Sequence, residues 1–194
     1  MDKFSDYIKK TNTVETNGTG EILFQDGNYK VKRAEGWIYM DEPDMIIAII
    51  YLSDTGEVMF RYEYVPTYKC RDSKEHYLTM LSGTMNKNEK PIQCLFREVL
   101  EETGMSLKPS VEAVEVNTLF VSKGCSAKYH IYFLEINSND YDQVEAKGDG
   151  SDAEANSQSI RIPVSQIPHL EIEDTITGYC VEYLKNYFKM NEIY

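Results

Sequence analysis

The sequence predicts an α/β (α+β) protein in which short β-strands are combined with two amphipathic helices. Residues 45–52 form a continuous β-branched run, which is typical of a strand buried on both faces. Apolar residues at helical spacing predict one helix from Pro91 to about Thr103 and a second over residues 176–190. The hydrophobic fraction of 42% in 194 residues is that of one globular domain with at most a small appendage.

The strands follow from alternation and from turn residues. Residues 20–39 alternate in a way that predicts two or three short strands. Residues 57–65 come directly after a turn, so we expect them to pair with the strand at 45–52 as a hairpin. A further strand pair is expected at 114–121 and 128–136, and a last short strand at 160–164. We therefore divide the chain into an N-terminal β region, 1–44, and a main domain, 45–194.

Both helices have a predicted inward face. In the first, Pro91 suits the opening position, and Gly104 suits the left-handed residue that follows a helix end. Its expected buried stripe is Ile92, Leu95, Phe96 and Val99. In the second helix, the residues expected to point inward are Ile176, Tyr179, Cys180, Tyr183, Leu184 and Tyr187.

Carboxylates gather on and just before the first helix. Glu98 and Glu102 are four residues apart and share one face, as do Arg97 and Glu101. With Glu89, these carboxylates would repel one another unless a cation held them together. Mg²⁺ prefers oxygen ligands of this kind and shares its sites with substrate phosphates. The alternative is a solvated acidic face on an ordinary amphipathic helix.

Composition excludes several classes of function. The net charge of −12 argues against nucleic-acid binding, which needs a basic surface. The same charge repels a phosphate substrate, so a cation and local basic residues would have to reverse it at a site. No apolar run approaches the roughly 20 residues of a membrane span, and residues 1–13 lack the apolar core of a secretory signal. The cysteines have no paired metal spacing and are expected to be free thiols in a reducing cytoplasm: Cys70, Cys94, Cys125 and Cys180.

The spacing of the window at residues 83–105 decides how the carboxylates are interpreted. It contains glycine, five residues, glutamate, seven residues, then Arg-Glu, an apolar residue, any residue, Glu-Glu, any residue, glycine and an apolar residue. This pattern resembles the signature of the Nudix hydrolase superfamily at every fixed position. The matching residues are Gly83, Glu89, Arg97, Glu98, Glu101, Glu102 and Gly104.

The flanking segments extend the resemblance. Residues 45–66, 119–136 and 148–167 are similar to those of the ADP-ribose and nucleotide-sugar pyrophosphatases of this superfamily. The resemblance implies an α/β/α sandwich with a mixed central sheet, preceded by a small antiparallel β region that exchanges between the subunits of a homodimer. One departure lies at Thr79, where these enzymes usually have a glutamate.

The resemblance also implies roles for residues. Glu98 and Glu102 would be the principal ligands of Mg²⁺, or of Mn²⁺ in its place, joined by Glu101 and the carbonyl of Ser82. Arg97 would orient the glutamates, with Glu89 in support. A carboxylate on the acidic segment 137–159 would activate water. The first candidates for that role are Glu154 and then Asp152. The segment could instead be disordered, since long polar loops are of either kind.

The implied activity is Mg²⁺-dependent hydrolysis of the pyrophosphate bond in a nucleoside diphosphate linked to another moiety. ADP-ribose or an ADP-sugar would give AMP and a sugar phosphate. A UDP-sugar or dinucleotide (NADH-type) substrate is the nearest alternative, and a non-catalytic nucleotide-sensing module is another. Trp37, Tyr39 or Tyr64 could stack on the base, with core packing as the alternative. The substrate-binding residues we expect are Arg61, Tyr64, Trp37 and Gly83.

Overall fold

The computed structural model describes residues 20–72, 74–147 and 156–193. These residues form two compact units. The N-terminal unit contains residues 20–44 and 120–128, and the main unit contains the remaining described residues. No helix among the described residues is both long and apolar enough to cross a membrane.

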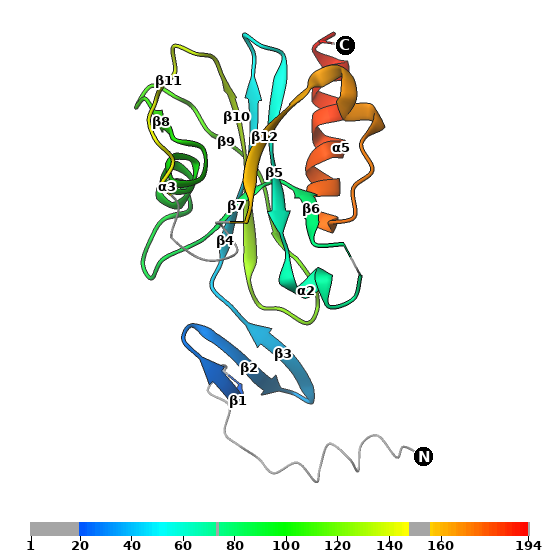
Figure 1. Cartoon of the computed structure of the whole chain (residues 1–194). Helices are drawn as coiled ribbons and strands as arrows, with labels where there is room; N and C mark the ends of the chain where they lie inside the picture. Colours follow the sequence, from blue (N-terminus) through cyan, green and yellow to red (C-terminus); the bar gives the residue numbers. More distant parts are fainter. Residues whose placement is uncertain (1–19, 73, 148–155, 194) are drawn as a thin grey trace. The chain divides into compact units, whose positions relative to one another are not determined.

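The N-terminal unit is a three-stranded antiparallel sheet in the order β1-β2-β3 (Figure 1). The segment at residues 120–128 is tied to the last strand, because Met40 N donates to the Gly124 carbonyl at 2.8 Å and Ser126 N donates to the Met40 carbonyl at 2.9 Å. The short strands predicted for residues 20–39 are thus confirmed. Their bounds are Glu21–Asp26 for β1, Tyr29–Ala34 for β2 and Trp37–Asp41 for β3.

The main unit is built on a seven-stranded mixed sheet with the order β12-β5-β4-β10-β9. Strand β10 runs parallel to β4, and β5 pairs antiparallel with both β4 and β12. Two short strands complete the sheet, β6 beside β5 and β7 beside β4. The bounds are β4 Met45–Leu52, β5 Glu57–Tyr64, β6 His76–Thr79, β7 Leu81–Thr84, β9 Val114–Phe120, β10 Lys128–Ile136 and β12 Gln158–Pro163.

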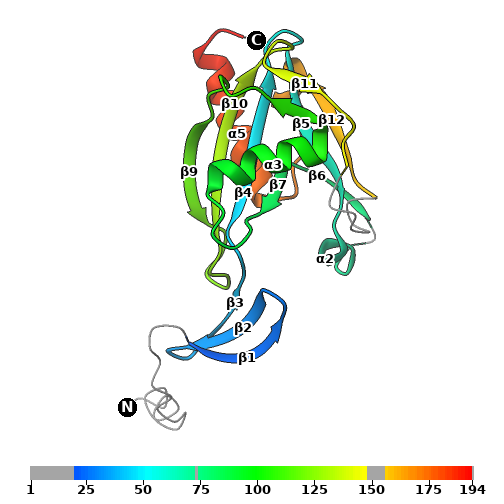
Figure 2. The ribbon, with the colours of Figure 1, turned by 90° about the vertical axis from the view of Figure 1, so that its left-hand side faces the viewer.

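Helices cover both faces of this sheet. Helix α3, Pro91–Thr103, lies on one face, and helix α5, Thr175–Met190, lies on the other (Figures 1 and 2). The predicted α/β/α sandwich with a mixed central sheet is therefore confirmed. Sequence reasoning missed the smaller elements: α2 Pro66–Lys69, β7, the 3₁₀ helix η1 Val164–His169, and the pair β8 Met105–Leu107 and β11 Tyr141–Gln143.

Helix α3 has the predicted bounds, and three of the four residues of its predicted stripe lie at the core: Ile92, Leu95 and Val99. Cys94, Leu95 and Val99 are buried against the sheet, whereas Phe96 is only partly buried and lies outside this core cluster. Cys94 and Glu98 are four residues apart on the face of α3 that meets β7. The contact of Glu98 with β7 brings Cys94 into the core and leaves Phe96 partly buried outside the cluster, so the prediction of a fully buried Phe96 was wrong.

Helix α5 presents most of the predicted face to the sheet. Tyr179 is 37% exposed, so the prediction that it points inward was wrong. Tyr183 and Tyr187 are partly buried, and their ring centroids lie 5.6 Å and 4.6 Å from that of Phe133 in β10, so both face the sheet as predicted. Their hydroxyls need polar partners, as Tyr187 shows by donating to Glu135 at 2.5 Å. The fully buried positions hold smaller or purely apolar side chains, and Ile176, Cys180 and Leu184 among them were predicted. The buried residues of α5 are Ile176, Thr177, Cys180, Val181, Leu184 and Phe188.

Gly104 ends α3 in the left-handed conformation, with φ of 70°. A Cβ there would overlap the carbonyl oxygen of Val144 and approach Nε2 of Gln143. The glycine therefore permits both the turn and the close approach of the chain that follows β11.

We expect Gly104→Ala to lower the free energy of unfolding by more than about 2 kcal/mol, because it adds a clash to the cost of a left-handed alanine. Urea denaturation followed by circular dichroism measures this. Gly56→Ala is the matched control, since Gly56 has φ of 67° with open space around it. An equal loss in the two variants would mean that the contact with Val144 contributes nothing.

Candidate functional site

Strand β7 and helix α3 place the signature residues next to each other. Gly83 lies in β7 and is buried, and the Glu98 side chain lies directly over it. A Cβ at Gly83 would overlap Cγ, Cδ and Oε1 of Glu98. Glycine is therefore required here, because only a backbone without a side chain lets the Glu98 carboxylate approach the strand so closely.

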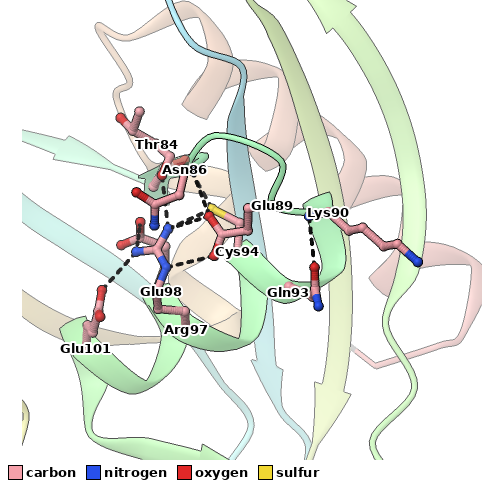
Figure 3. Close-up of polar contacts among 10 residues, drawn as sticks. Thr84, Asn86, Glu89, Lys90, Gln93, Cys94, Arg97, Glu98 and Glu101 are labelled. Atoms are coloured by element: carbon pink, nitrogen blue, oxygen red, sulfur yellow. Dashed lines mark hydrogen bonds and ion pairs between the residues drawn. The ribbon is translucent and has the colours of Figure 1, made fainter. Parts of the chain in front are cut away.

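Arg97 holds three of the signature carboxylates (Figure 3). Its Nε and Nη2 atoms donate to the two carboxylate oxygens of Glu89, both at 2.9 Å. Its Nη1 atom donates to Glu98 Oε1 at 2.7 Å and to Glu101 Oε2 at 3.0 Å. Its Nη2 atom also donates to the carbonyl of Thr84 at 3.0 Å. One planar guanidinium thus ties the loop before α3 to two successive turns of the helix.

The Arg97 guanidinium lowers the pKa of Glu89 strongly, whereas burial outweighs its effect on the pKa values of Glu98 and Cys94. The hydrogen bonds from Arg97 lower the pKa of Glu89 to about 2, helped by the backbone N–H of Asn86, which donates to Glu89 at 2.7 Å. Burial raises the pKa of Glu98 even though Arg97 opposes that rise. Burial also raises the pKa of the Cys94 thiol to about 12, so it stays neutral beside Arg97. All four cysteines are free thiols, as predicted.

Glu102 has a different cationic partner. Its Oε2 atom lies 3.7 Å from Nε of Arg61, which belongs to β5 and is only 5% exposed. The Arg61 Nη1 atom donates to the hydroxyl of Ser159 at 3.3 Å, and that hydroxyl donates to the main-chain carbonyl of Glu102 at 3.1 Å. Sequence reasoning missed Ser159, because its place depends on the pairing of β12 with β5.

The donor set fits a hard divalent cation. Four carboxylates face two guanidiniums, which leaves a formal charge of −2 when all six groups are ionised. Carboxylate oxygens are the ligands that Mg²⁺ prefers. Across the ranges 20–72, 74–147 and 156–193, however, no three His, Cys, Asp or Glu side chains are already gathered as metal ligands. Their assignment as ligands, together with the carbonyl of Ser82 in β7, stays a prediction.

The residues expected to bind substrate lie in different places. Trp37 is 63% exposed in the N-terminal unit, so the core-packing alternative is wrong for it. Tyr64 is partly buried, and its ring lies 5.9 Å from that of His76 and 5.4 Å from Nζ of Lys69. Arg61 is directed at Glu102, as described above. The expectation that these residues contact a substrate stays a prediction.

Glu154 and Asp152, the candidates for activating water, lie outside the described residues. The chain on either side of them bonds to the end of α3. Before them, Val144 N donates to the Gly104 carbonyl at 2.8 Å. After them, Ser159 donates to the Glu102 carbonyl. The two flanks therefore meet the helix at its carboxylate-bearing end.

No protein-family model and no curated protein matches this sequence. Among solved structures, an ADP compounds hydrolase matches with a TM-score of 0.63 at 14% identity, covering 88% of this chain and 92% of that one. The fold is the Nudix fold. A chain from a study of MutT from Aliivibrio salmonicida and Vibrio cholerae matches with a TM-score of 0.48 at 15% identity, covering 72% of this chain and 97% of that one.

The Arg97–Glu89 pair predicts a pH-dependent contribution to stability. The folded pKa of about 2 lies below the ordinary value of 4.5, so the ionised pair stabilises the fold above pH 4.5 and loses this effect as the pH falls towards 2. In EDTA, we expect Glu89→Gln to cost about 1.5–3 kcal/mol at pH 7 and progressively less below pH 4.5. Urea titrations from pH 2 to 7 measure this.

Glu182→Gln is the control for this prediction. Glu182 forms an exposed ion pair with Lys185 on α5, and we expect its replacement to cost less than about 1 kcal/mol at any pH. A loss at Glu89→Gln that did not change between pH 7 and pH 3 would contradict the assignment of the stabilisation to the ionised carboxylate.

Proposed function

We propose that the protein is an enzyme that hydrolyses the pyrophosphate bond of a nucleoside diphosphate linked to another moiety. The observation that carries this proposal is the cluster of signature carboxylates that Arg97 holds on and just before α3, with Glu98 lying over Gly83, within a Nudix fold. A sensing module that no longer cleaves its nucleotide would have little need for all four carboxylates, since their mutual repulsion costs stability.

ADP-ribose or an ADP-sugar is the substrate class we propose, with AMP and a sugar phosphate as products. Two observations support this choice. The segments that flank the signature are similar to those of ADP-ribose and nucleotide-sugar pyrophosphatases. The solved structure with the TM-score of 0.63 is an ADP compounds hydrolase. The nearest rivals are UDP-sugars and dinucleotides.

In the mechanism we propose, Glu98, Glu102, Glu101 and the carbonyl of Ser82 would hold the metal. When bound, Mg²⁺ or Mn²⁺ would supply charge neutralisation at the bridging phosphates and a more acidic water. Arg97 would keep Glu98 and Glu101 in place, and the bidentate contact with Glu89 would keep the guanidinium in place.

The remaining roles complete the proposal. Glu154, or Asp152 in its place, would take the proton from the attacking water, a step worth about 10²–10⁴-fold in rate. Trp37 would offer an exposed ring to the base, and Tyr64 a partly buried one. Arg61 and Gly83 are the other candidates for contact with the substrate, since both lie next to signature glutamates.

Glu102→Gln tests the proposal, because it keeps the shape of the side chain and removes one charge from the cluster. Wild-type protein would first be screened with Mg²⁺ against ADP-ribose, ADP-glucose, UDP-glucose, NADH and dinucleoside polyphosphates, with products identified. We expect Glu102→Gln to slow cleavage of the best substrate at least about 10²-fold, and EDTA to abolish it.

Glu182→Gln on α5 is the matched control and should keep wild-type rates. Near-wild-type cleavage by Glu102→Gln would disprove the metal assignment. Cleavage of no compound in the screen would favour the sensing module, and a preference for UDP-glucose would overturn the adenosine assignment.

We also propose that the protein forms a homodimer through its N-terminal unit. Register places Phe24, Val31 and Met40 on one face of the three-stranded sheet, and alternation adds Tyr29 and Ile38. Phe24 is 63% exposed and Ile38 is 56% exposed. A sheet of three short strands needs its apolar face covered, and no helix lies among the described residues of this unit. A second copy of the chain would cover it.

We expect the double variant Phe24→Glu, Ile38→Glu to sediment as a monomer at micromolar concentration, because two charges would be buried unpaired in the interface. Wild-type protein should sediment as a dimer in the same analytical ultracentrifugation experiment. Met190→Glu is the control, since Met190 is also exposed but lies at the end of α5. A monomeric wild type would overturn the proposal.

A further inference from the structure

Arg61 is a buried cation in the middle of a sheet. It lies in β5 between two neighbouring strands, with Thr79 of β6 and Ser159 of β12 as its cross-strand partners. A buried guanidinium is costly unless charges and hydrogen-bond acceptors surround it. The partners that the structure assigns to its side chain are the Glu102 carboxylate and the Ser159 hydroxyl.

These contacts fix Glu102 at two points. The carboxylate is attracted to Arg61 Nε, 3.7 Å from its Oε2 atom, and the main-chain carbonyl accepts from the Ser159 hydroxyl at 3.1 Å. That hydroxyl in turn accepts from Arg61 Nη1 at 3.3 Å. Side chain and backbone of the same glutamate are therefore tied to one pair of strands.

The two arginines divide the carboxylates between them. Arg97 donates to Glu89, Glu98 and Glu101, whereas Arg61 pairs with Glu102. Glu98 and Glu102 share one face of α3 and repel each other. The two carboxylates lie against different strands, Glu98 against Gly83 of β7 and Glu102 beside Arg61 of β5.

The contact made by Arg61 is also looser than the contacts made by Arg97. A distance of 3.7 Å is an ion pair without a hydrogen bond, whereas Arg97 Nη1 reaches Glu98 Oε1 at 2.7 Å. An arginine at the longer distance orients a carboxylate without competing strongly for its oxygen atoms.

We propose that Arg61 is a positioning residue that, together with Ser159, orients the Glu102 carboxylate for a divalent cation. The inference rests on the proposed function in one respect, the assignment of Glu102 as a metal ligand. It differs from the expectation that Arg61 contacts the substrate. The two roles separate in experiment, since a positioning residue acts before any substrate is present.

The first test measures Mn²⁺ binding to the full chain without substrate. The electron paramagnetic resonance signal of the free ion reports how much Mn²⁺ is unbound. Loss of an outer partner typically weakens metal affinity about 10–100-fold, and we expect Arg61→Gln to fall in this range. Ser159→Ala should also weaken binding, and Arg61→Lys, which keeps the charge, should recover part of the affinity.

Arg161→Gln is the matched control, because Arg161 lies in β12 two residues from Ser159 and is exposed. It should bind Mn²⁺ like the wild type. If Arg61→Gln kept wild-type Mn²⁺ affinity but raised KM with kcat unchanged, Arg61 would be a substrate contact and the inference would be overturned.

A double-mutant cycle of Arg61→Gln and Glu102→Gln, measured by urea unfolding in EDTA, is the second test. We expect the double variant to lose less stability than the two single variants added together. Simple additivity would overturn the inference. Should Arg61→Gln fail to fold, Arg61→Lys and Ser159→Ala replace it in both tests. A wild type that binds no Mn²⁺ would overturn the proposed function, while the cycle would still decide whether Arg61 positions Glu102.

Discussion

The candidate site depends on one constraint, the mutual repulsion of four carboxylates, of which one lies in the loop before α3 and three lie in the second half of the helix. Arg97 makes hydrogen bonds to three of them and also to the carbonyl of Thr84, so it links the helix to the loop that precedes it. Glu98 could not reach its place without Gly83, whose missing side chain makes room for it. Cys94 and Glu98 both lie on the face of α3 that meets β7, so the cluster and the buried side of the helix share one contact with the strand.

The net charge of −12 bears on how a substrate could approach the carboxylate cluster. An acidic protein repels a nucleoside diphosphate at long range, and the four carboxylates of the cluster concentrate part of that charge at the site. Two guanidiniums bring the formal charge of the cluster only to −2, a charge that one divalent cation would neutralise. Binding of the cation and approach of the substrate are thus coupled electrostatically in the function we propose.

Local patterns in the sequence predicted much of the fold, and non-local pairings explain the differences. Pro91 and Gly104 fixed the ends of α3, because each suits a single position at a helix end. The spacing of the signature predicted that Glu89, Arg97 and the helix glutamates lie close together, because all of them belong to one loop and the helix that follows it. Ser159 could not be found this way, because it meets Arg61 through strands that are 98 residues apart in the chain.

The errors in the predicted helix faces also arise because periodicity does not take account of tertiary contacts. An apolar stripe read from periodicity treats Tyr179 as equivalent to Val181, yet the hydroxyl of Tyr179 needs a polar partner and accepts from Asn117 at 3.1 Å. Val181 has no such need and is buried. Periodicity predicted both the helix and most of its inward face, and the hydroxyl group explains the one position, Tyr179, that it assigned wrongly.

At Thr79 the sequence differs from the pyrophosphatases that it resembles, and this residue is a neighbour of Arg61 in the sheet. Those enzymes usually have a glutamate at this position, which in this fold lies directly across from Arg61. A carboxylate at residue 79 would compete with Glu102 for that guanidinium. The threonine instead donates to Glu63 at 2.7 Å, and the charge of Arg61 is directed to α3. With threonine at residue 79, the cross-strand neighbour of Arg61 brings no charge of its own, and the ion pair of Arg61 with Glu102 has no competing carboxylate at that position.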